Sequence, residues 1–568
     1  MIHKKETQVQ YTIVFKSANS GDVKVPAVSG ANVLELAQKA GVKIDAPCSG
    51  NGVCGKCRVR IIAGAVEHPD NSLHLTKEEY ADGWRLACQC SVMGDATILV
   101  PTEAGAFAND IRTADLSSQE EIERYEKAVE AIFSTGLRRG TAEKGIGVAV
   151  DIGTTTVTAA MLDLQTGSIL AKASAGNGQI RYGADVINRI IQSAKEGGRE
   201  KLRHAVREET LNRLLDSLCA SSGRVPEEIS RFVIAGNTTM EHLFVGADAQ
   251  TIRMEPYVPE FLELRGKTAG ELGIPGKPEA PVIFAPNVGS YVGGDITAGV
   301  LTTLLWDQDD LILFIDLGTN GELVLGDRDF MLTCACSAGP AFEGGEISCG
   351  MRATTGAVQG VSLDAETLEP VYDVIGEPGQ KPSGLCGSGL IDMIAELFRC
   401  GAISAKGRFI RENRRIGCDA YGSGYYVVAF PEESATGREI TLLEGDIDNF
   451  IKAKAAIFSA TRTMLNGAGL TVDDLQHVLI AGGIGSGIDI EKAIEIGMLP
   501  KLPVEEFSYI GNSSLTGACA MLLSDEATEK VFALGRSMTY LELSTHPGYM
   551  DEFVAACFIP HTDETLFD

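Results

Sequence analysis

The 568-residue sequence predicts a multidomain α/β protein, and three observations carry that prediction. A chain of this length corresponds to about three or four domains of roughly 150 residues each. Five of the 14 cysteines lie within the first 90 residues, which sets the N-terminal part apart. From Ile146 onward, apolar strands end in glycine-rich turns, and two of these turn sequences recur later in the same order. We therefore expect a small cysteine-rich domain, a linker and a duplicated α/β unit.

The composition is that of a folded globular protein, with 44% apolar and 22% charged residues. The 49 Lys and Arg residues against 77 Asp and Glu residues give a net charge of −28, which repels phosphate backbones and anionic membranes. The N-terminus lacks the apolar core of a signal peptide, and no apolar run is long enough for a spanning helix. We expect a cytoplasmic protein that binds neither nucleic acid nor membrane.

Residues 1–100 are expected to form a small β-rich domain with one helix. Clusters of β-forming residues predict strands at 9–16, 23–28, 58–62 and 96–100. Asn32 can cap a helix, because an apolar-periodic stretch from Val33 to Ala40 follows it directly.

Residues 101–145 are expected to be a linker, rich in Glu, Ala and Ser, that contains one helix. Apolar side chains recur at helical spacing at Ile122, Tyr125, Val129, Ile132 and Phe133. Ser117, Ser118 and Glu121 precede this pattern and suit a helix start. We expect the helix to pack on its own chain, and a contact with a second copy of the chain is the alternative.

Two repeated turn sequences predict that the rest of the chain is duplicated. Residues 149–155 match residues 314–320, and residues 232–238 resemble residues 478–484. Matches in the same order argue for two related halves that meet at a cleft. The expected domains are 1–100, the linker 101–145, a first half 146–305 and a second half 306–568.

The N-terminal cysteines have the spacing of an iron–sulfur site. The candidate ligands are Cys48, Cys54, Cys57 and Cys88, which give C-x5-C-x2-C-x30-C. Three thiolates on one loop with a distant fourth match a [2Fe–2S] ferredoxin, and the first gap resembles the adrenodoxin-type loop. Gly50, Gly52 and Gly55 let the loop backbone approach the sulfur atoms closely.

Two alternatives to this ligand set stay open. Zinc also binds thiolates, although structural zinc sites usually pair two C-x2-4-C knuckles, and the cysteines could also be unliganded core thiols. Cys90 competes with Cys88 as the fourth ligand. We favour Cys88, because its distance from Cys57 follows the usual ferredoxin spacing, and expect Cys90 to be a buried apolar residue.

Two strand ends carry residues suited to phosphate and metal. Asp151 and Asp316 each end an apolar strand, where a carboxylate can organise a metal ion. Backbone and hydroxyl donors for phosphate follow at Gly153, Thr154, Thr155, Gly318, Thr319 and Asn320. One such turn alone fits a plain β-turn equally well. A third turn at 481–487 contains Gly482 and Gly483, and the chain has no G-x4-G-K-[ST] loop.

The three turns together resemble those of the actin-like ATPase superfamily, which includes sugar kinases, Hsp70 chaperones and actin. The resemblance implies that Asp151 and Asp316 position Mg²⁺ and water, and that the Gly and Thr residues of the two turns contact phosphate. It places Gly482 and Gly483 on the nucleoside side. Glu322 is a candidate for orienting the attacking water, with a plain strand carboxylate as the equal alternative, and Glu343 is equally open.

Nearly the whole chain resembles the RACo-type reductive activators of corrinoid proteins. The motifs concerned are PCSGNGVCGKC and residues 182–189, 235–240, 292–296, 338–344 and 385–390. The resemblance implies a β-grasp [2Fe–2S] ferredoxin-like domain, a linker and a duplicated actin-like (RNase H-like) ATPase. It also implies ATP-dependent one-electron reduction of a Co(II) corrinoid to Co(I), with a [2Fe–2S] cluster, ATP and Mg²⁺ as cofactors. The implied partners are a corrinoid protein of a methyl-transfer system, an upstream electron donor and a second copy of the chain.

Three other functions remain as alternatives at this point. An ATP-dependent electron donor to another low-potential enzyme, such as a dehydratase activator, shares the ATPase half but carries a bridging [4Fe–4S] cluster. A binding or chaperone module would use ATP to gate partner affinity and the cluster to sense redox state. A metabolite kinase would transfer phosphate to a small molecule.

Overall fold

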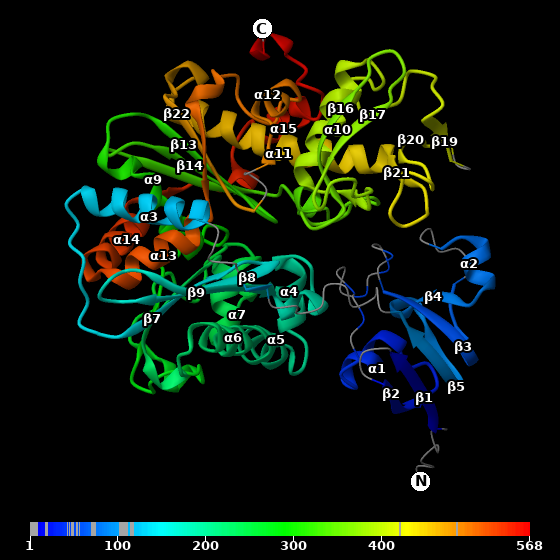
Figure 1. The fold of residues 1–568 in the computed structure, drawn as a ribbon, viewed down its shortest axis with the longest axis horizontal. Helices are drawn as coiled ribbons and strands as arrows, with labels where there is room; N and C mark the ends of the chain where they lie inside the picture. The colour runs from blue at the N-terminus through cyan, green and yellow to red at the C-terminus, as the bar shows by residue number, and fades with distance from the viewer. Residues whose placement is uncertain are drawn as a thin grey trace.

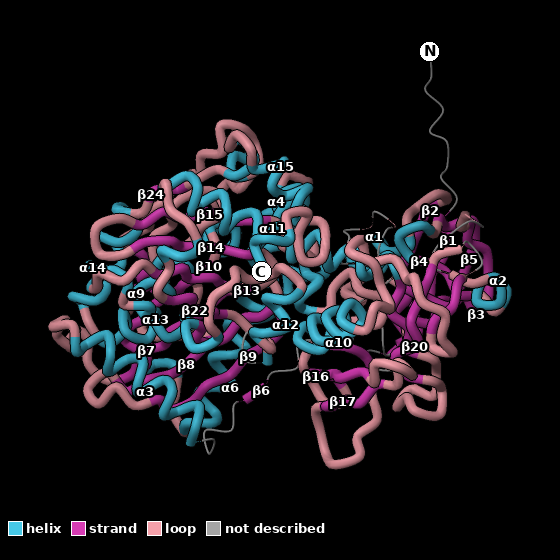
Figure 2. Tube along the Cα trace, turned by 90° about the horizontal axis from the view of Figure 1, so that it is seen from above, coloured by secondary structure: helices cyan, strands magenta, loops and turns pink. Residues whose placement is uncertain are grey.

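The computed structural model describes residues 10–17, 21–42, 44, 46, 50, 52, 55, 57–69, 75–101, 112–113, 119–419, 422–483 and 487–567. Figure 1 shows a small N-terminal domain, in blue, beside a larger body that contains the rest of the described chain. Figure 2 shows the same two parts from above. Within the described residues, none of the helices has the length and apolar composition needed to cross a lipid bilayer.

The N-terminal domain is a five-stranded sheet with helices beside it. Its strands, in the sheet order β2-β1-β5-β3-β4, are β1 (Gln10–Ser17), β2 (Gly21–Val28), β3 (Arg58–Glu67), β4 (Trp84–Leu86) and β5 (Ser91–Val100). Its helices are α1 (Val33–Lys39) and α2 (Lys77–Ala81). Ile13, Phe15 and Ile98 are fully buried with Val33 in one apolar cluster. The predicted strands and the predicted helix are confirmed, and β4 and α2 are additional.

Helix α3 (Gln119–Ser134) lies in the segment predicted to be a linker. Its side chains Val129 and Ile132 are buried in an apolar cluster that also contains residues of helices α9 (Gly294–Thr303) and α13 (Ser513–Leu523). The predicted helix and its packing on its own chain are therefore confirmed. The short strand β6 (Arg112–Thr113), just before α3, pairs with the edge of the next sheet.

Replacing Ile132 by alanine is expected to destabilise the larger body by roughly 3 kcal/mol, because it leaves a cavity in a packed core. Ile132 is 0% exposed, so water does not replace the packing contacts that the truncated side chain loses. Denaturant unfolding followed by far-UV circular dichroism measures the change. Lys127→Ala, on the exposed face of the same helix, is the control and should change stability by less than about 0.5 kcal/mol. Equal stabilities of the two variants would contradict the packing of α3.

Two larger sheets form the centre of the body. The first has the order β11-β12-β10-β7-β8-β9-β6 and comprises β7 (Ile146–Ile152), β8 (Thr156–Asp163), β9 (Ile169–Gly176), β10 (Ile229–Gly236), β11 (Lys267–Thr268) and β12 (Pro281–Phe284), besides β6. The second has the order β23-β22-β13-β14-β15-β24 and comprises β13 (Ile312–Leu317), β14 (Gly321–Gly326), β15 (Met331–Cys336), β22 (His477–Ala481), β23 (Phe507–Gly511) and β24 (Thr539–Tyr540).

The two sheets repeat one topology. In the first, β7 pairs parallel with β10 and antiparallel with β8, which pairs antiparallel with β9. In the second, β13 pairs parallel with β22 and antiparallel with β14, which pairs antiparallel with β15. The duplication predicted from the repeated turns is confirmed, and the matching turns β7–β8 and β13–β14 occupy equivalent places.

Helices cover these sheets. Those of the first half are α4 (Val186–Ser193), α5 (Gly198–Val206), α6 (Asn212–Ser222), α7 (Thr238–Val245) and α8 (Ala269–Leu272). Those of the second half are α10 (Gly387–Arg399), α11 (Glu444–Ala468), α12 (Ile490–Glu495), α14 (Asp525–Ser537) and α15 (Tyr549–Ala556). Helix α13 packs against β7 and β10, so this C-terminal segment returns to the sheet of the first half.

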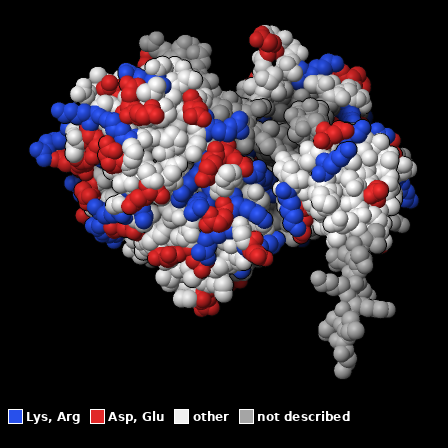
Figure 3. Space-filling view, turned by 90° about the horizontal axis from the view of Figure 1, so that it is seen from below, with Lys and Arg blue, Asp and Glu red and all other residues white. Residues whose placement is uncertain are grey.

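Two small sheets extend the second half. One comprises β16 (Ala357–Leu363), β17 (Pro370–Val374) and β18 (Gly384–Leu385), and the other β19 (Ile416–Cys418), β20 (Gly424–Ala429) and β21 (Ile440–Leu443). Figure 1 shows them on the side of the body nearest the N-terminal domain. On the face drawn in Figure 3, acidic and basic side chains are interspersed over the body, and much of the small domain is uncharged.

Candidate functional site

The N-terminal domain brings two of the predicted cluster ligands together. The Sγ atoms of Cys57 and Cys88 lie 3.3 Å apart, and the residues are only 1% and 9% exposed. This separation is short enough for both thiolates to bind one tetrahedral metal ion. Cys48 and Cys54 lie outside the described residues. The described pair therefore fits a [2Fe–2S] cluster, in which each iron takes two thiolates.

Hydrogen bonds fix the segment that carries Cys88. The N–H of Ala87 donates to the carbonyl of Cys57 at 2.8 Å, which ties the two cysteine segments together. Asn32 caps α1 as predicted, since its Oδ1 accepts from the N–H of Glu35 at 3.2 Å, and its amide also donates to the carbonyl of Cys88 at 2.7 Å. The cap of the helix thus also positions the predicted fourth ligand.

The Cys90 side chain is 0% exposed within the apolar core of the same domain. Burial raises the pKa of its thiol to about 12, which disfavours the thiolate that metal binding requires. This environment supports the predicted role of Cys90 as a small buried apolar residue.

In the larger body, Asp151 stands at the end of β7 and is held by the start of α13. Asn512 Nδ2 and Ser514 Oγ donate to its two carboxylate oxygens at 2.8 and 2.9 Å. Burial raises the pKa of Asp151, while these two hydrogen bonds lower it. Two residues far along the sequence therefore orient the acid of the first turn.

Three further carboxyl groups lie around the second turn, of which Asp295 and Asp316 are half-buried and Glu322 is buried. Burial and the charge of Asp151 raise the pKa of Asp316, at the end of β13, to about 7. Burial and the charges of Asp316 and Asp151 raise the pKa of Asp295, in the first turn of α9, to about 8. Glu322 faces Asp316 across the β13–β14 pair, and burial followed by the charges of Asp295 and Asp316 raises its pKa well above the usual range. Carboxyl groups gathered in this way suit a site that receives a cation.

Asp295 is a candidate functional residue that the sequence argument did not assign. Its signal is present in the sequence, because Gly293 and Gly294 place an acid at the start of an otherwise apolar helix. Within the part of the chain that the structure describes, no group of three or more His, Cys, Asp or Glu side chains is arranged as a preformed metal site. The carboxyl groups therefore do not form a complete cage by themselves.

Polar side chains hold the first turn from behind. The Arg189 side chain is 0% exposed, and its Nη2 donates to the carbonyl of Thr154 at 2.5 Å. Asn237 Nδ2 donates to the Thr154 hydroxyl, and Asn177 Nδ2 to the carbonyl of Gly153, both at 2.9 Å. The Thr154 hydroxyl therefore faces the protein interior, and Arg189 and Asn177 hold the carbonyls of Thr154 and Gly153.

The two turns meet at their threonines. Thr155 Oγ1 and Thr319 Oγ1 lie 2.9 Å apart, although they come from different halves of the chain. Glu343 Oε2 accepts a hydrogen bond from Thr155 at 2.8 Å and lies 3.0 Å from the Thr319 hydroxyl. Gly318 and Asn320 close the second turn through a backbone hydrogen bond of 3.0 Å. The predicted phosphate residues are thus adjacent in space.

Gly482, which the resemblance places on the nucleoside side, lies against Leu317, the last residue of β13. Its φ of +99° is left-handed, and a Cβ there would lie 2.2 Å from the carbonyl oxygen of Leu317, so only glycine fits. Tyr509 donates to the Gly482 carbonyl at 2.9 Å. Within the described residues, a Cβ on Gly483 would meet no atom of a non-neighbouring residue within 4 Å.

Comparisons with known proteins cover most of the chain. Residues 17–93 match the 2Fe-2S iron-sulfur cluster binding domain, residues 146–308 the RACo middle region, and residues 310–568 the C-terminal domain of RACo, the ASKHA domain. The chain is 35% identical over 422 residues to the corrinoid activation enzyme RamQ of Eubacterium limosum, covering 72% of this chain and 69% of that protein.

Two further similarities agree with these matches. The chain is 26% identical over 423 residues to the [Co(II) methylated amine-specific corrinoid protein] reductase of Methanosarcina barkeri, covering 69% of this chain and 73% of that protein. A solved structure described as a reductive activator for corrinoid,iron-sulfur protein is 38% identical, with a TM-score of 0.69, covering 98% of this chain and 99% of that one.

Proposed function

This chain belongs to the RACo family and reductively activates corrinoid proteins, and from that premise we propose that ATP turnover between its two phosphate turns drives the reduction of Co(II) to Co(I). The observation that carries the proposal is the meeting of Thr155 and Thr319, one from each duplicated half. A phosphate bound between these hydroxyls contacts both halves at once. Nucleotide state can therefore set how the halves sit relative to each other.

Energy input is needed because the electron transfer is uphill. A one-electron couple changes tenfold per roughly 59 mV, so moving the equilibrium a thousandfold takes about 180 mV, or near 4 kcal/mol. ATP can supply this only if its bound and product states differ in their affinity for the corrinoid protein. A cleft between two duplicated halves is a two-state element of the kind this coupling requires.

The half-buried carboxyl groups of Asp151, Asp295 and Asp316 fit Mg²⁺ together with ATP. Mg²⁺ is usually held by one or two carboxylates, phosphate oxygens and water, so an incomplete protein cage suits it. We assign Asp151 and Asp316 to Mg²⁺ and water positioning, with Asp295 beside them. Backbone groups of the two turns and the hydroxyls of Thr155 and Thr319 would contact phosphate, and Gly482 and Gly483 the nucleoside.

The cluster domain completes the assignment. Bound to Cys48, Cys54, Cys57 and Cys88, a [2Fe–2S] cluster supplies one-electron chemistry. The domain's own residues exclude water from Cys57 and Cys88, which are nearly fully buried. We propose a cytoplasmic homodimer that receives electrons from an upstream donor and serves a corrinoid protein of a methyl-transfer system, in keeping with the names of the two relatives.

A coupled assay tests the proposed function. The reduced protein is mixed under anoxia with a Co(II) corrinoid protein, and the Co(I) absorbance is followed with Mg²⁺-ATP, with Mg²⁺-ADP and without nucleotide, in parallel with phosphate release. We expect sustained Co(I) formation only with ATP, because binding alone shifts an equilibrium no further than its differential affinity allows. Equal Co(I) yields under all three conditions would refute ATP coupling.

A further inference from the structure

Glu343 occupies an unusual position for a negatively charged side chain. One of its carboxylate oxygens lies 2.8 Å from the Thr155 hydroxyl and 3.0 Å from the Thr319 hydroxyl. These are the two hydroxyls assigned above to phosphate, one from each half of the chain. An anionic oxygen placed between them is the arrangement that a phosphate oxygen would adopt.

The hydroxyl groups cannot serve both anions. Each threonine hydroxyl carries a single proton and donates one hydrogen bond at a time. A terminal phosphate that takes the donors of Thr155 and Thr319 must therefore displace the Glu343 carboxylate. Two anions at contact distance also repel each other, which makes simultaneous occupancy costly.

A buried positive charge lies behind this position. Arg189 is 0% exposed, and within the described residues its hydrogen bonds end on neutral groups, namely Thr154, Gly183, Gln179 and Met240. Burial lowers the pKa of Arg189 to about 9, and the negative charges of Asp185 and Glu343 oppose this lowering. Glu343 thus contributes to balancing a buried charge that a phosphate would balance equally well.

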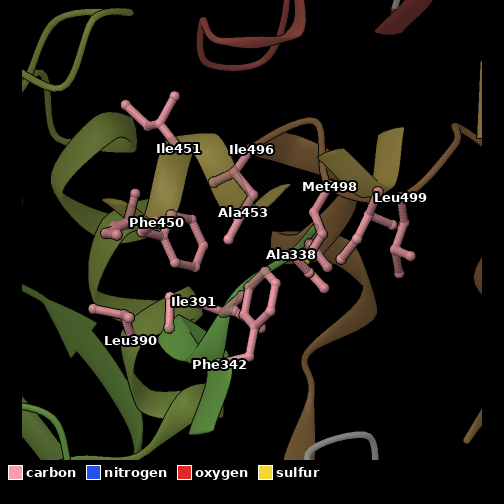
Figure 4. Close-up of a cluster of buried hydrophobic side chains, with 14 of the residues drawn as sticks. Ala338, Phe342, Leu390, Ile391, Phe450, Ile451, Ala453, Ile496, Met498 and Leu499 are labelled. Carbon is pink, nitrogen blue, oxygen red and sulfur yellow. The ribbon is translucent and has the colours of Figure 1, made fainter. Parts of the chain in front are cut away.

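The neighbouring residues hold Glu343 in place. It ends the short helical turn Pro340–Glu343, and the preceding Phe342 is 1% exposed. The ring of Phe342 packs edge-on against Phe450 of α11, with centroids 5.6 Å apart, and Figure 4 shows it within the apolar cluster. After Glu343, Gly344 has a φ of +74°, and a Cβ there would lie 2.5 Å from the Met351 nitrogen. The carboxylate is therefore presented by a well-packed backbone.

We propose that Glu343 is an internal competitor of the terminal phosphate of ATP, bridging Thr155 and Thr319 until that phosphate displaces it. The inference rests on the proposed nucleotide site and deepens it. When ATP binds, its terminal phosphate replaces the Glu343 carboxylate as the group that bridges Thr155 and Thr319. The contact between the halves is kept in both states, and its geometry differs because a phosphate is larger than a carboxylate oxygen.

Nucleotide affinities of variants test the proposal. Binding of ADP and of the non-hydrolysable β,γ-imido analogue of ATP is measured by calorimetry with the full-length chain and Mg²⁺. Glu343→Gln should bind the imido analogue about tenfold more tightly, because a neutral amide competes less well than a carboxylate for the two hydroxyls. Its affinity for ADP, which lacks the terminal phosphate, should change less than about twofold.

Two further variants separate this effect from general electrostatics. Glu346→Gln removes the same charge three residues away at an exposed position and should leave both affinities unchanged. Glu343→Asp keeps the charge but shortens the reach to the hydroxyls, and should also tighten binding of the imido analogue. If Glu343→Gln fails to fold, judged by circular dichroism, Glu343→Asp decides alone.

Three results would overturn the proposal. Unchanged or weaker binding of the imido analogue would show that Glu343 does not compete with phosphate. If Glu346→Gln bound the imido analogue more tightly to the same extent, the change in net charge alone would explain the effect. Loss of hydrolysis without tighter binding would make Glu343 a catalytic residue. The assay contains neither corrinoid protein nor reductant, so selective tightening together with ATP-independent Co(I) formation would retain this inference and refute the proposed function.

Discussion

Replacing Asp316 by alanine is expected to slow ATP hydrolysis about a thousandfold, which corresponds to roughly 4 kcal/mol of lost transition-state stabilisation. Asp316 is the penultimate residue of β13, just before the second turn, and burial together with the charge of Asp151 raises its pKa to about 7. A divalent cation that binds beside such a carboxyl group stabilises its ionised form. In the proposed assignment, the Asp316→Ala substitution removes a carboxylate that positions the cation, and that cation neutralises the phosphate charge. Phosphate release at saturating Mg²⁺ and ATP measures the loss.

The iron–sulfur spectrum of the Asp316→Ala variant should be unchanged, since Asp316 lies in β13 of the larger body, whereas Cys57 and Cys88 belong to the apolar cluster of the N-terminal domain. Asp329→Ala is the matched control, because Asp329 lies in the same half, on the exposed turn between β14 and β15. That variant should hydrolyse ATP like the unaltered chain. Normal turnover in Asp316→Ala would show that the second turn is only structural.

Replacing Cys57 by serine is expected to remove the [2Fe–2S] cluster and leave ATP binding intact. The Cys57 sulfur lies 3.3 Å from that of Cys88 in a buried site, so its loss leaves the cluster with three of its four thiolates. Iron and sulfide analysis should give about two of each per unaltered chain. The variant should lack the visible absorption and the electron paramagnetic resonance signal of the reduced cluster.

Cys90→Ser is the control for this experiment. Cys90 is buried in the apolar core, and burial raises the pKa of its thiol to about 12, so we expect the cluster to survive the substitution. Loss of the cluster in Cys90→Ser, with retention in Cys88→Ser, would transfer the fourth-ligand role to Cys90. Four irons per unaltered chain would refute the [2Fe–2S] assignment.

Features that depend on neighbouring residues could be predicted from the sequence. The helix cap at Asn32, the amphipathic helix at 119–134 and the glycine turns after Asp151 and Asp316 all depend on side chains within a few positions of one another. The duplication was also accessible, because both halves keep the same turn sequences where each central strand ends. The domain bounds and the role of each site residue stay predictions.

Features that depend on contacts between distant parts of the chain could not be predicted from the sequence. Asp151 is held by Asn512 and Ser514, more than 360 positions away, since α13 returns to the first sheet. Residues 513–523 are assigned by sequence order to the second half, yet they pack against β7 and β10. Order along the chain does not reveal which sheet a terminal helix covers, because only the packing of apolar faces decides it.

The sequence by itself therefore determined the iron–sulfur cofactor class, the two glycine turns and the family resemblance, since each depends on short motifs with their own chemistry. Only the tertiary structure decided that Asp295 joins Asp151, Asp316 and Glu322, and that Glu343 lies between Thr155 and Thr319. The physical reason is that the energy of a charged side chain depends on which charges and donors lie within a few ångströms. That arrangement arises only when the two halves and the C-terminal helices pack together.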